Sequence, residues 1–121
     1  MAMVTEATAQ SLSPMRDELA TYADTAGLRL TVGNPSATEM TVVMSAYEAD
    51  WQPLEGARAS RDAVRLQAGQ TTPLFVTVPL DQQQSRDVRI CATSLPQPSS
   101  GTGGTAIRGQ VCGRYGVRRV R

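Results

Sequence analysis

The chain of 121 residues contains no histidine and no lysine. Without histidine, imidazole metal sites, Ser–His and Cys–His nucleophile pairs and the usual general base near neutral pH are excluded. Without lysine, a Schiff-base mechanism and a phosphate-binding loop of the Gly-Lys-Ser/Thr type are excluded as well. We therefore expect a protein that is not an enzyme and that uses neither a cofactor nor a metal.

Long apolar runs and aromatic residues are also scarce. No stretch approaches the roughly 18 apolar residues of a transmembrane helix, so no membrane insertion is expected. Aromatic residues make up only 4% of the chain. At this length we expect one domain with one modest core, which a covalent cross-link would help to stabilise.

All twelve cationic side chains are arginines, and they are distributed unevenly. Residues 1–60 carry three arginines and eight acidic residues, whereas residues 61–121 carry nine arginines and three aspartates. Either the second half forms a basic binding face, or folding brings the two halves together and cancels the difference. The closing sequence RYGVRRVR is not the aromatic and basic platform of proteins that bind single-stranded nucleic acid. Capture of an anion such as a carboxylate is the sharper hypothesis, because arginine suits carboxylates and phosphates.

The first ten residues are expected to be a leader and residues 11–121 the folded domain. Ala7 and Ala9 are spaced like the −3 and −1 residues of a signal-peptidase site, which would make Gln10 the first residue after cleavage. A disordered cytosolic leader is the alternative interpretation of the same residues. The first interpretation predicts export to the periplasm.

Short runs of alternating apolar residues between turn signals predict an all-β protein. We expect about seven antiparallel strands in an immunoglobulin-like β-sandwich, because the runs recur every 8–12 residues. The expected strands lie within residues 15–23, 27–32, 39–51, 62–66, 73–80, 85–95 and 106–120. The first of these is the least regular and could also form a helical turn.

The two cysteines, Cys91 and Cys112, are too few for a zinc site and are not a Cys-x-x-Cys redox motif. Alternation along their strands places both on the faces opposite to the apolar residues. If they pair, the register of one long hairpin centres between Gly101 and Thr102, in the Gly/Ser tract. The sequence therefore predicts a disulfide across the last hairpin and an oxidising compartment. The Gly/Ser tract is then a hairpin tip, since no Lys-Ser/Thr ending follows it.

The order of these segments resembles the N-terminal immunoglobulin-like domain of periplasmic pilus (fimbrial) chaperones. The resemblance covers about residues 11–121 and rests on the segments SPMRDEL, LTVGNPSATEMTVVMSAYEAD, VRLQAGQTTPLFVTVP, RDVRICATSL and QVCGRYGVRRV. The family has two domains, whereas this chain has the length of one, so we expect a single-domain relative. The resemblance implies a binding protein that captures a subunit of a pilus or another secreted fibre.

The resemblance also implies which residues bind the subunit. Basic residues on the first and last strands of the family anchor the C-terminal carboxylate of a subunit, and Arg16 matches the first of them. Arg114, or Arg118 in a shifted register, is expected to be the second. The last strand pairs with the incomplete sheet of the subunit, which is β-augmentation. The residues expected along that edge are Ile107, Val111, Tyr115 and Val117.

Three other hypotheses about partners stay open at this point. The single-domain inhibitors of amyloid fibre (curli) assembly have a comparable size and fold type. A structural or accessory component of a surface appendage is the other functional alternative. The edge strands could also pair two copies of the chain in a homodimer. Nucleic acid is not an expected partner.

Overall fold

The structure is a computed structural model that describes residues 10–95 and 109–120. Within these residues the fold is all-β, with nine strands and no helix, so none of them belongs to a helix that could span a membrane. The strands are β1 (Ser11–Ser13), β2 (Arg16–Thr21), β3 (Thr25–Gly33), β4 (Met40–Glu48), β5 (Arg58–Ala59), β6 (Ala63–Leu66), β7 (Thr71–Pro79), β8 (Ser85–Leu95) and β9 (Gln110–Arg119).

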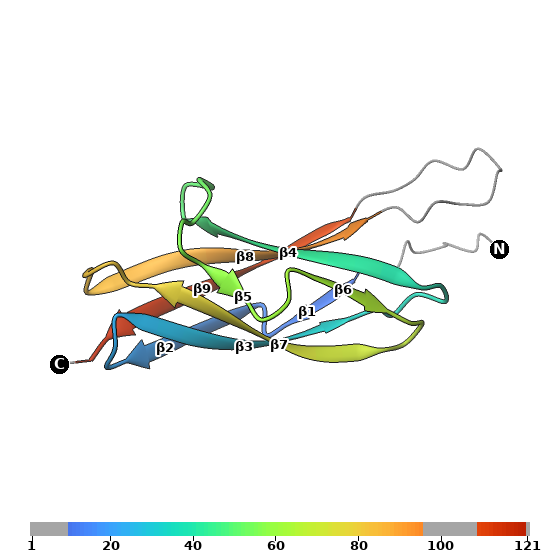
Figure 1. Cartoon of the computed structure of the whole chain (residues 1–121), viewed down its shortest axis with the longest axis horizontal. Helices are drawn as coiled ribbons and strands as arrows, with labels where there is room; N and C mark the ends of the chain where they lie inside the picture. Colours follow the sequence, from blue (N-terminus) through green and yellow to red (C-terminus); the bar gives the residue numbers. More distant parts are fainter. Residues whose placement is uncertain (1–9, 96–108, 121) are drawn as a thin grey trace, which may run out of the picture.

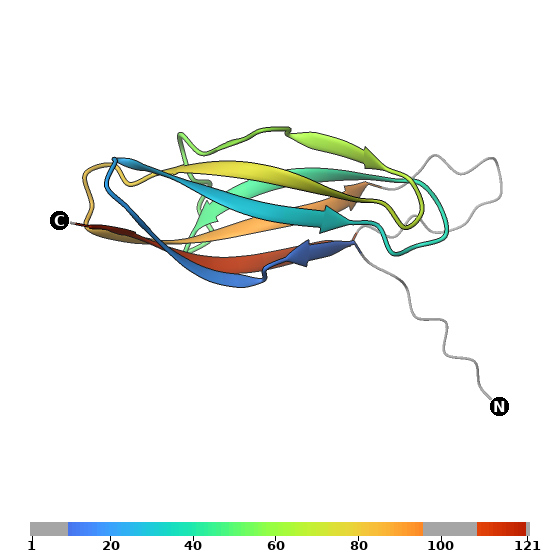
Figure 2. The same cartoon turned by 90° about the horizontal axis from the view of Figure 1, so that it is seen from below.

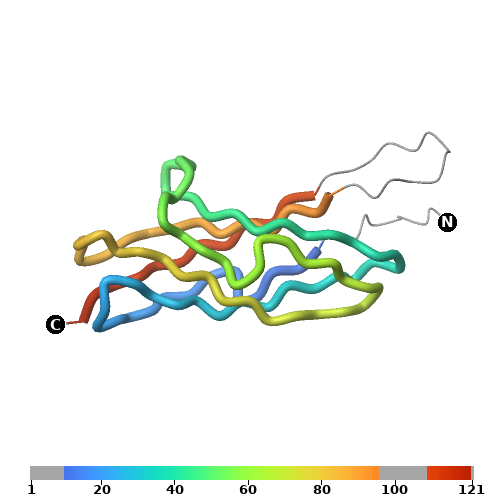
Figure 3. Tube along the Cα trace, in the orientation of Figure 1, coloured from blue at the N-terminus to red at the C-terminus, as the bar shows by residue number. Residues whose placement is uncertain are grey.

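The strands form two sheets that pack as a sandwich. One sheet has four strands in the order β1-β3-β7-β5, and the other has five in the order β2-β9-β8-β4-β6. Figures 1 and 2 show the two sheets as stacked layers, with β8 and β9 running along the length of the domain. The same two strands lie side by side in the Cα trace (Figure 3), which agrees with their antiparallel pairing. The predicted β-sandwich with immunoglobulin-like architecture is confirmed.

The core lies between the sheets and consists of the apolar residues that the alternation predicts. In β3, every second residue from Ala26 to Val32 is buried, and β7 repeats the pattern from Leu74 to Val78. These two strands pair antiparallel over nine residues, so their apolar faces form one continuous surface. The facing surface comes from the five-stranded sheet, and its largest fully buried side chain is Tyr115.

The N-terminal part of the domain differs from the prediction. The chain forms two strands there instead of one: β1 pairs with β3 in the first sheet, and β2 pairs with β9 in the second. The change of sheet occurs at Pro14, which follows a cis peptide bond. The β2–β9 pairing is parallel, so the prediction of purely antiparallel strands is wrong at this position. The two-residue strand β5 lies between the strands expected at 39–51 and 62–66, where the sequence predicts none.

Gln10, the first residue after the predicted cleavage site, packs against the folded domain. Its side chain is buried, and its Nε2 donates hydrogen bonds to the carbonyls of Ala92 and, at 2.9 Å, Gly109. It therefore links the start of β1 to the start of β9. The rest of the predicted leader, residues 1–9, lies outside the described residues.

Asn34 holds the turn that follows β3, where the sequence Gly-Asn-Pro-Ser predicts one. The Asn34 side chain is buried, and its Nδ2 donates to the carbonyls of Thr38 at 2.8 Å and Leu66 at 3.0 Å. Its Oδ1 accepts from the hydroxyl of Ser36 at 2.6 Å. One amide therefore ties the turn after β3 to the end of β6, because each buried carbonyl needs a donor.

The glycine at position 113 has a packing role in the last strand. A Cβ at Gly113 would lie 2.2 Å from the Tyr115 hydroxyl oxygen and 2.6 Å from its Cζ. The Tyr115 ring therefore lies across Gly113, and its hydroxyl donates to the carbonyl of Pro14 at 2.6 Å. This bond attaches β9 to the segment in which the chain changes sheet.

Candidate functional site

The register of the last hairpin is set by the pair Cys91–Cys112, which is disulfide-bonded with a Cα–Cα distance of 4.0 Å. The predicted disulfide and its register are therefore confirmed, while the hairpin tip lies outside the described residues. The flanking residues Ile90 and Ala92 belong to the core, so Cys91 is on the opposite, outer face of the sheet. Cys91 is nevertheless completely buried.

The same register brings three arginines into one row across the outer face of the five-stranded sheet. Arg16 on β2 is the Cα partner of Arg114 on β9, and Arg114 is the partner of Arg89 on β8. Paired residues project to the same face of a sheet, with their Cβ atoms about 5 Å apart. All three arginines line a shallow depression of about 220 Å³, and the acidic residues Asp17, Glu18 and Asp87 line it as well. On the far side of Arg89 the row continues with the uncharged Tyr47 of β4.

The next row of the same face is acidic. Glu18 and Asp87 are the partners of Gly116 on its two sides, and a Cβ at Gly116 would lie 3.6 Å from an atom of each. These carboxylates still leave the arginines unpaired: within residues 10–95 and 109–120, neither Arg16, Arg89 nor Arg114 has a carboxylate oxygen within 4 Å. The face therefore presents a cationic row beside an anionic one.

The row of arginines begins where β9 gains a partner on its outer side. The backbone N–H of Arg114 donates to the carbonyl of Met15 at 2.8 Å, and β2 accompanies β9 from there to Arg119. Backbone groups alternate sides along a strand, so the N–H and C=O groups of Gln110 and Cys112 point to the same outer side. In the described part of the chain no strand pairs with them there. Among residues 10–95 and 109–120, the first half of β9 therefore has no strand partner on its outer side, and we call it the free edge, which lies next to the arginine row.

The predicted site residues do not all lie together in the structure. Arg16 and Arg114 are brought together, whereas Arg118 lies further along the same face and pairs with Ala20 and Ser85. Val111 lies on the free half of β9 and is partly buried against the core.

The structure differs from the prediction for Tyr115 and Val117, which are 1% exposed. Both point into the core, and their half of β9 is paired on both sides, so they are not edge residues. Ile107 lies outside the described residues.

Sequence reasoning missed Arg89, although the necessary signal was present. The register that pairs Cys91 with Cys112 also pairs residue 89 with residue 114, because residue 89 lies two positions before Cys91 and residue 114 lies two positions after Cys112. The register alone would have placed Arg89 beside Arg114.

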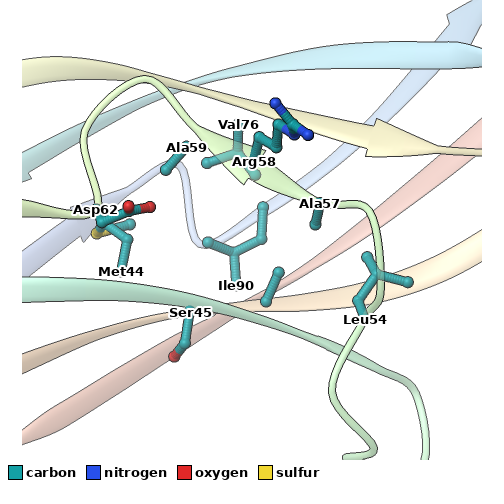
Figure 4. A pocket seen from close by; sticks show the side chains of 10 residues that line it. Met44, Ser45, Leu54, Ala57, Arg58, Ala59, Asp62, Val76 and Ile90 are labelled. Atoms are coloured by element: carbon teal, nitrogen blue, oxygen red, sulfur yellow. The ribbon is translucent and has the colours of Figure 1, made fainter.

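A separate cavity of about 80 Å³ lies between the sheets, beneath the segment of residues 54–62 (Figure 4). Apolar side chains such as Leu54, Val76 and Ile90 line most of it. Its two charged lining residues, Arg58 and Asp62, are both exposed. Groups of three or more His, Cys, Asp or Glu residues that could hold a metal do not occur in the described part of the chain.

Comparison with known proteins identifies the fold. No protein-family model matches the chain, and no curated protein sequence matches it. Among solved structures, the E. coli chaperone DraB superimposes with a TM-score of 0.76 at 19% identity, over 93% of this chain and 55% of DraB. The fold is that of PapD-like fimbrial chaperones.

Two further structures show how widely the PapD-like fold occurs. A chain from the complex of the Salmonella enterica SafA pilin with the SafB chaperone matches with a TM-score of 0.76 at 20% identity, over 95% of this chain and 56% of that one. A PapD-like domain of human CEP192 matches with a TM-score of 0.68 at 9% identity, over 93% of this chain and 86% of the domain. This chain thus spans little more than half the length of the matched bacterial chains.

Proposed function

We propose that this domain is a chaperone-like binding protein that captures a subunit of a pilus or another secreted fibre. Arg16 and Arg114 bind the C-terminal carboxylate of the subunit, and the free half of β9 pairs with its last residues by β-augmentation. The observation that carries the proposal is the pairing of Arg16 with Arg114 directly beside an unpaired sheet edge.

The structural relatives support this function in preference to the other classes. The relatives DraB and SafB are named as chaperones, and SafB is in complex with a pilin. A human domain shares the fold, so the argument for a fibre subunit depends on the arginines and the edge as well as on the fold. Another solved structure of this fold, SfaE, is named as a periplasmic chaperone, which favours a periplasmic location for this domain. The disulfide suits that location, because such bonds persist in oxidising compartments.

Binding, and not catalysis, is the activity that these features favour. The arginines can bind an anion but cannot act as general bases near neutral pH. The relatives give no support to an inhibitor of amyloid fibre assembly or an appendage component, and the homodimer stays a prediction without support.

A pair of synthetic peptides tests the proposal. Both are N-terminally labelled octapeptides that alternate valine and threonine and end in glutamine; one has a free C-terminal carboxylate and the other a C-terminal amide. Fluorescence anisotropy should show roughly tenfold tighter binding of the free acid, since charge-assisted hydrogen bonds to guanidinium groups are the stronger kind. Arg16→Gln and Arg114→Gln should each remove most of that difference.

Arg29→Gln is the matched control, because Arg29 is an exposed arginine on β3 in the other sheet, opposite Phe75. It should leave the affinity for both peptides unchanged. Equal affinity of the wild-type protein for the acid and the amide would contradict the proposal.

A further inference from the structure

Arg89 adds a third guanidinium group to the proposed anchor, and two guanidiniums already suffice for one carboxylate. A terminal carboxylate has two oxygens, which Arg16 and Arg114 can bind from adjacent strands. Arg89 is the partner of Arg114 on the other side, one strand further from the free edge. It is half-buried, and its Nη1 makes only a long hydrogen bond, 3.3 Å, to the carbonyl of Val88.

Three adjacent arginines carry a cost in the free domain. Like charges directly opposite each other on neighbouring strands are destabilising. Every acidic residue of the sequence except Glu6 lies in the described part, and none of them reaches Arg89, Arg114 or Arg16 within 4 Å. The nearest row of carboxylates, Glu18 and Asp87, flanks Gly116, so it would repel an anion on that side. A second anion therefore fits best in line with the row, at Arg89.

The spacing of the row restricts where the second anion can be. Neighbouring strands are about 4.8 Å apart. In a peptide that ends in aspartate or glutamate, the side-chain carboxylate is separated from the terminal carboxylate by a few carbon–carbon bonds, a distance of the same order. An acidic side chain nearer to the N-terminus of an extended peptide would lie along the edge of β9, farther from Arg89.

We infer that Arg89 makes this site selective for proteins whose C-terminal residue is itself acidic, with the terminal carboxylate at Arg16 and Arg114 and the side-chain carboxylate at Arg89. This inference rests on the proposed function and names the ligand class of that same site. Arg89 is a specificity-determining residue, and Arg16 and Arg114 are the general anchor.

The experiment adds a third peptide to the two above, identical to the free acid but ending in glutamate instead of glutamine. The wild-type protein should bind the glutamate peptide roughly three- to tenfold more tightly than the glutamine peptide at low salt, because one partly buried charge pair is added. Arg89→Gln should bring this ratio to about one while the preference for acid over amide persists. Arg29→Gln should preserve the ratio.

The free energy of unfolding separates binding from structure. Arg89→Gln should leave it unchanged or raise it slightly, since a like-charge neighbour is removed. The inference is overturned if the wild-type protein does not prefer the glutamate peptide, or if Arg89→Gln keeps that preference. It is also overturned if Arg89→Gln weakens both peptides equally and lowers stability. If the wild-type protein bound the free-acid and the amide peptide equally well, the proposed function itself would be contradicted.

Discussion

The contact between Tyr115 and Pro14 gives the sharpest prediction about stability. The Tyr115 hydroxyl donates a 2.6 Å hydrogen bond to the Pro14 carbonyl from a residue that is 1% exposed. Tyr115→Phe keeps the ring and removes this bond, which leaves the carbonyl without its donor. We expect a loss of about 1–2 kcal/mol in the free energy of unfolding, the usual cost of removing one partner of a partly buried hydrogen bond.

Urea denaturation followed by circular dichroism measures this loss. Tyr22→Phe is the control, because Tyr22 is 84% exposed and should change stability by less than about 0.5 kcal/mol. Gly113→Ala tests the other side of the contact, and a Cβ at 2.2 Å from the hydroxyl should cost roughly 3 kcal/mol. Combining it with Tyr115→Leu should cost less than the sum of the two single changes, since the clash is removed. A Tyr115→Phe variant as stable as the wild-type protein, or strictly additive costs, would refute the reasoning.

Three further predictions concern the same domain. Replacing Cys91 and Cys112 with alanine should lower the free energy of unfolding by about 3 kcal/mol, because the disulfide joins two residues that are 21 positions apart. A reductant should lower the free energy of unfolding of the wild-type protein by a similar amount and should not change that of the variant. Asn34→Ala should cost about 3 kcal/mol in urea denaturation, since buried carbonyls lose their donor, and a loss below about 1 kcal/mol would contradict that role. Burial, followed by the Asp17 carboxylate, raises the pKa of Tyr115 to about 12 from about 10 in the unfolded chain. Stability should therefore be complete below pH 10 and fall by roughly 2–3 kcal/mol towards pH 12, and Tyr115→Phe should abolish that fall.

Much of the fold follows from alternation and register. The central strands alternate strictly, so their buried residues, such as Leu30 and Val76, could be assigned from the sequence. The change of sheet at Pro14 could not, because β2 lies at the edge of its sheet and exposes four of its six residues, which leaves no apolar period to detect.

The candidate site could be predicted only in part, for a related reason. The sequence gives residue types and faces, but which strand lies beside β9 is a property of the whole sheet. The sequence therefore predicts Tyr115 and Val117 as edge residues, whereas the parallel strand β2 pairs with their half of β9. Arg16 and Arg114 came from a family resemblance, whereas the position of Arg89 required the register of the hairpin.

The most direct test of subunit capture is amide hydrogen exchange by NMR in the presence of saturating free-acid peptide. If a peptide strand pairs with the free half of β9, the outward-pointing N–H groups of Gln110 and Cys112 should exchange at least tenfold more slowly than in the free domain. The amide-terminated peptide at the same concentration should protect them much less. Unchanged exchange at both positions, or protection confined to the opposite edge at Ala63–Leu66, would contradict the proposed function.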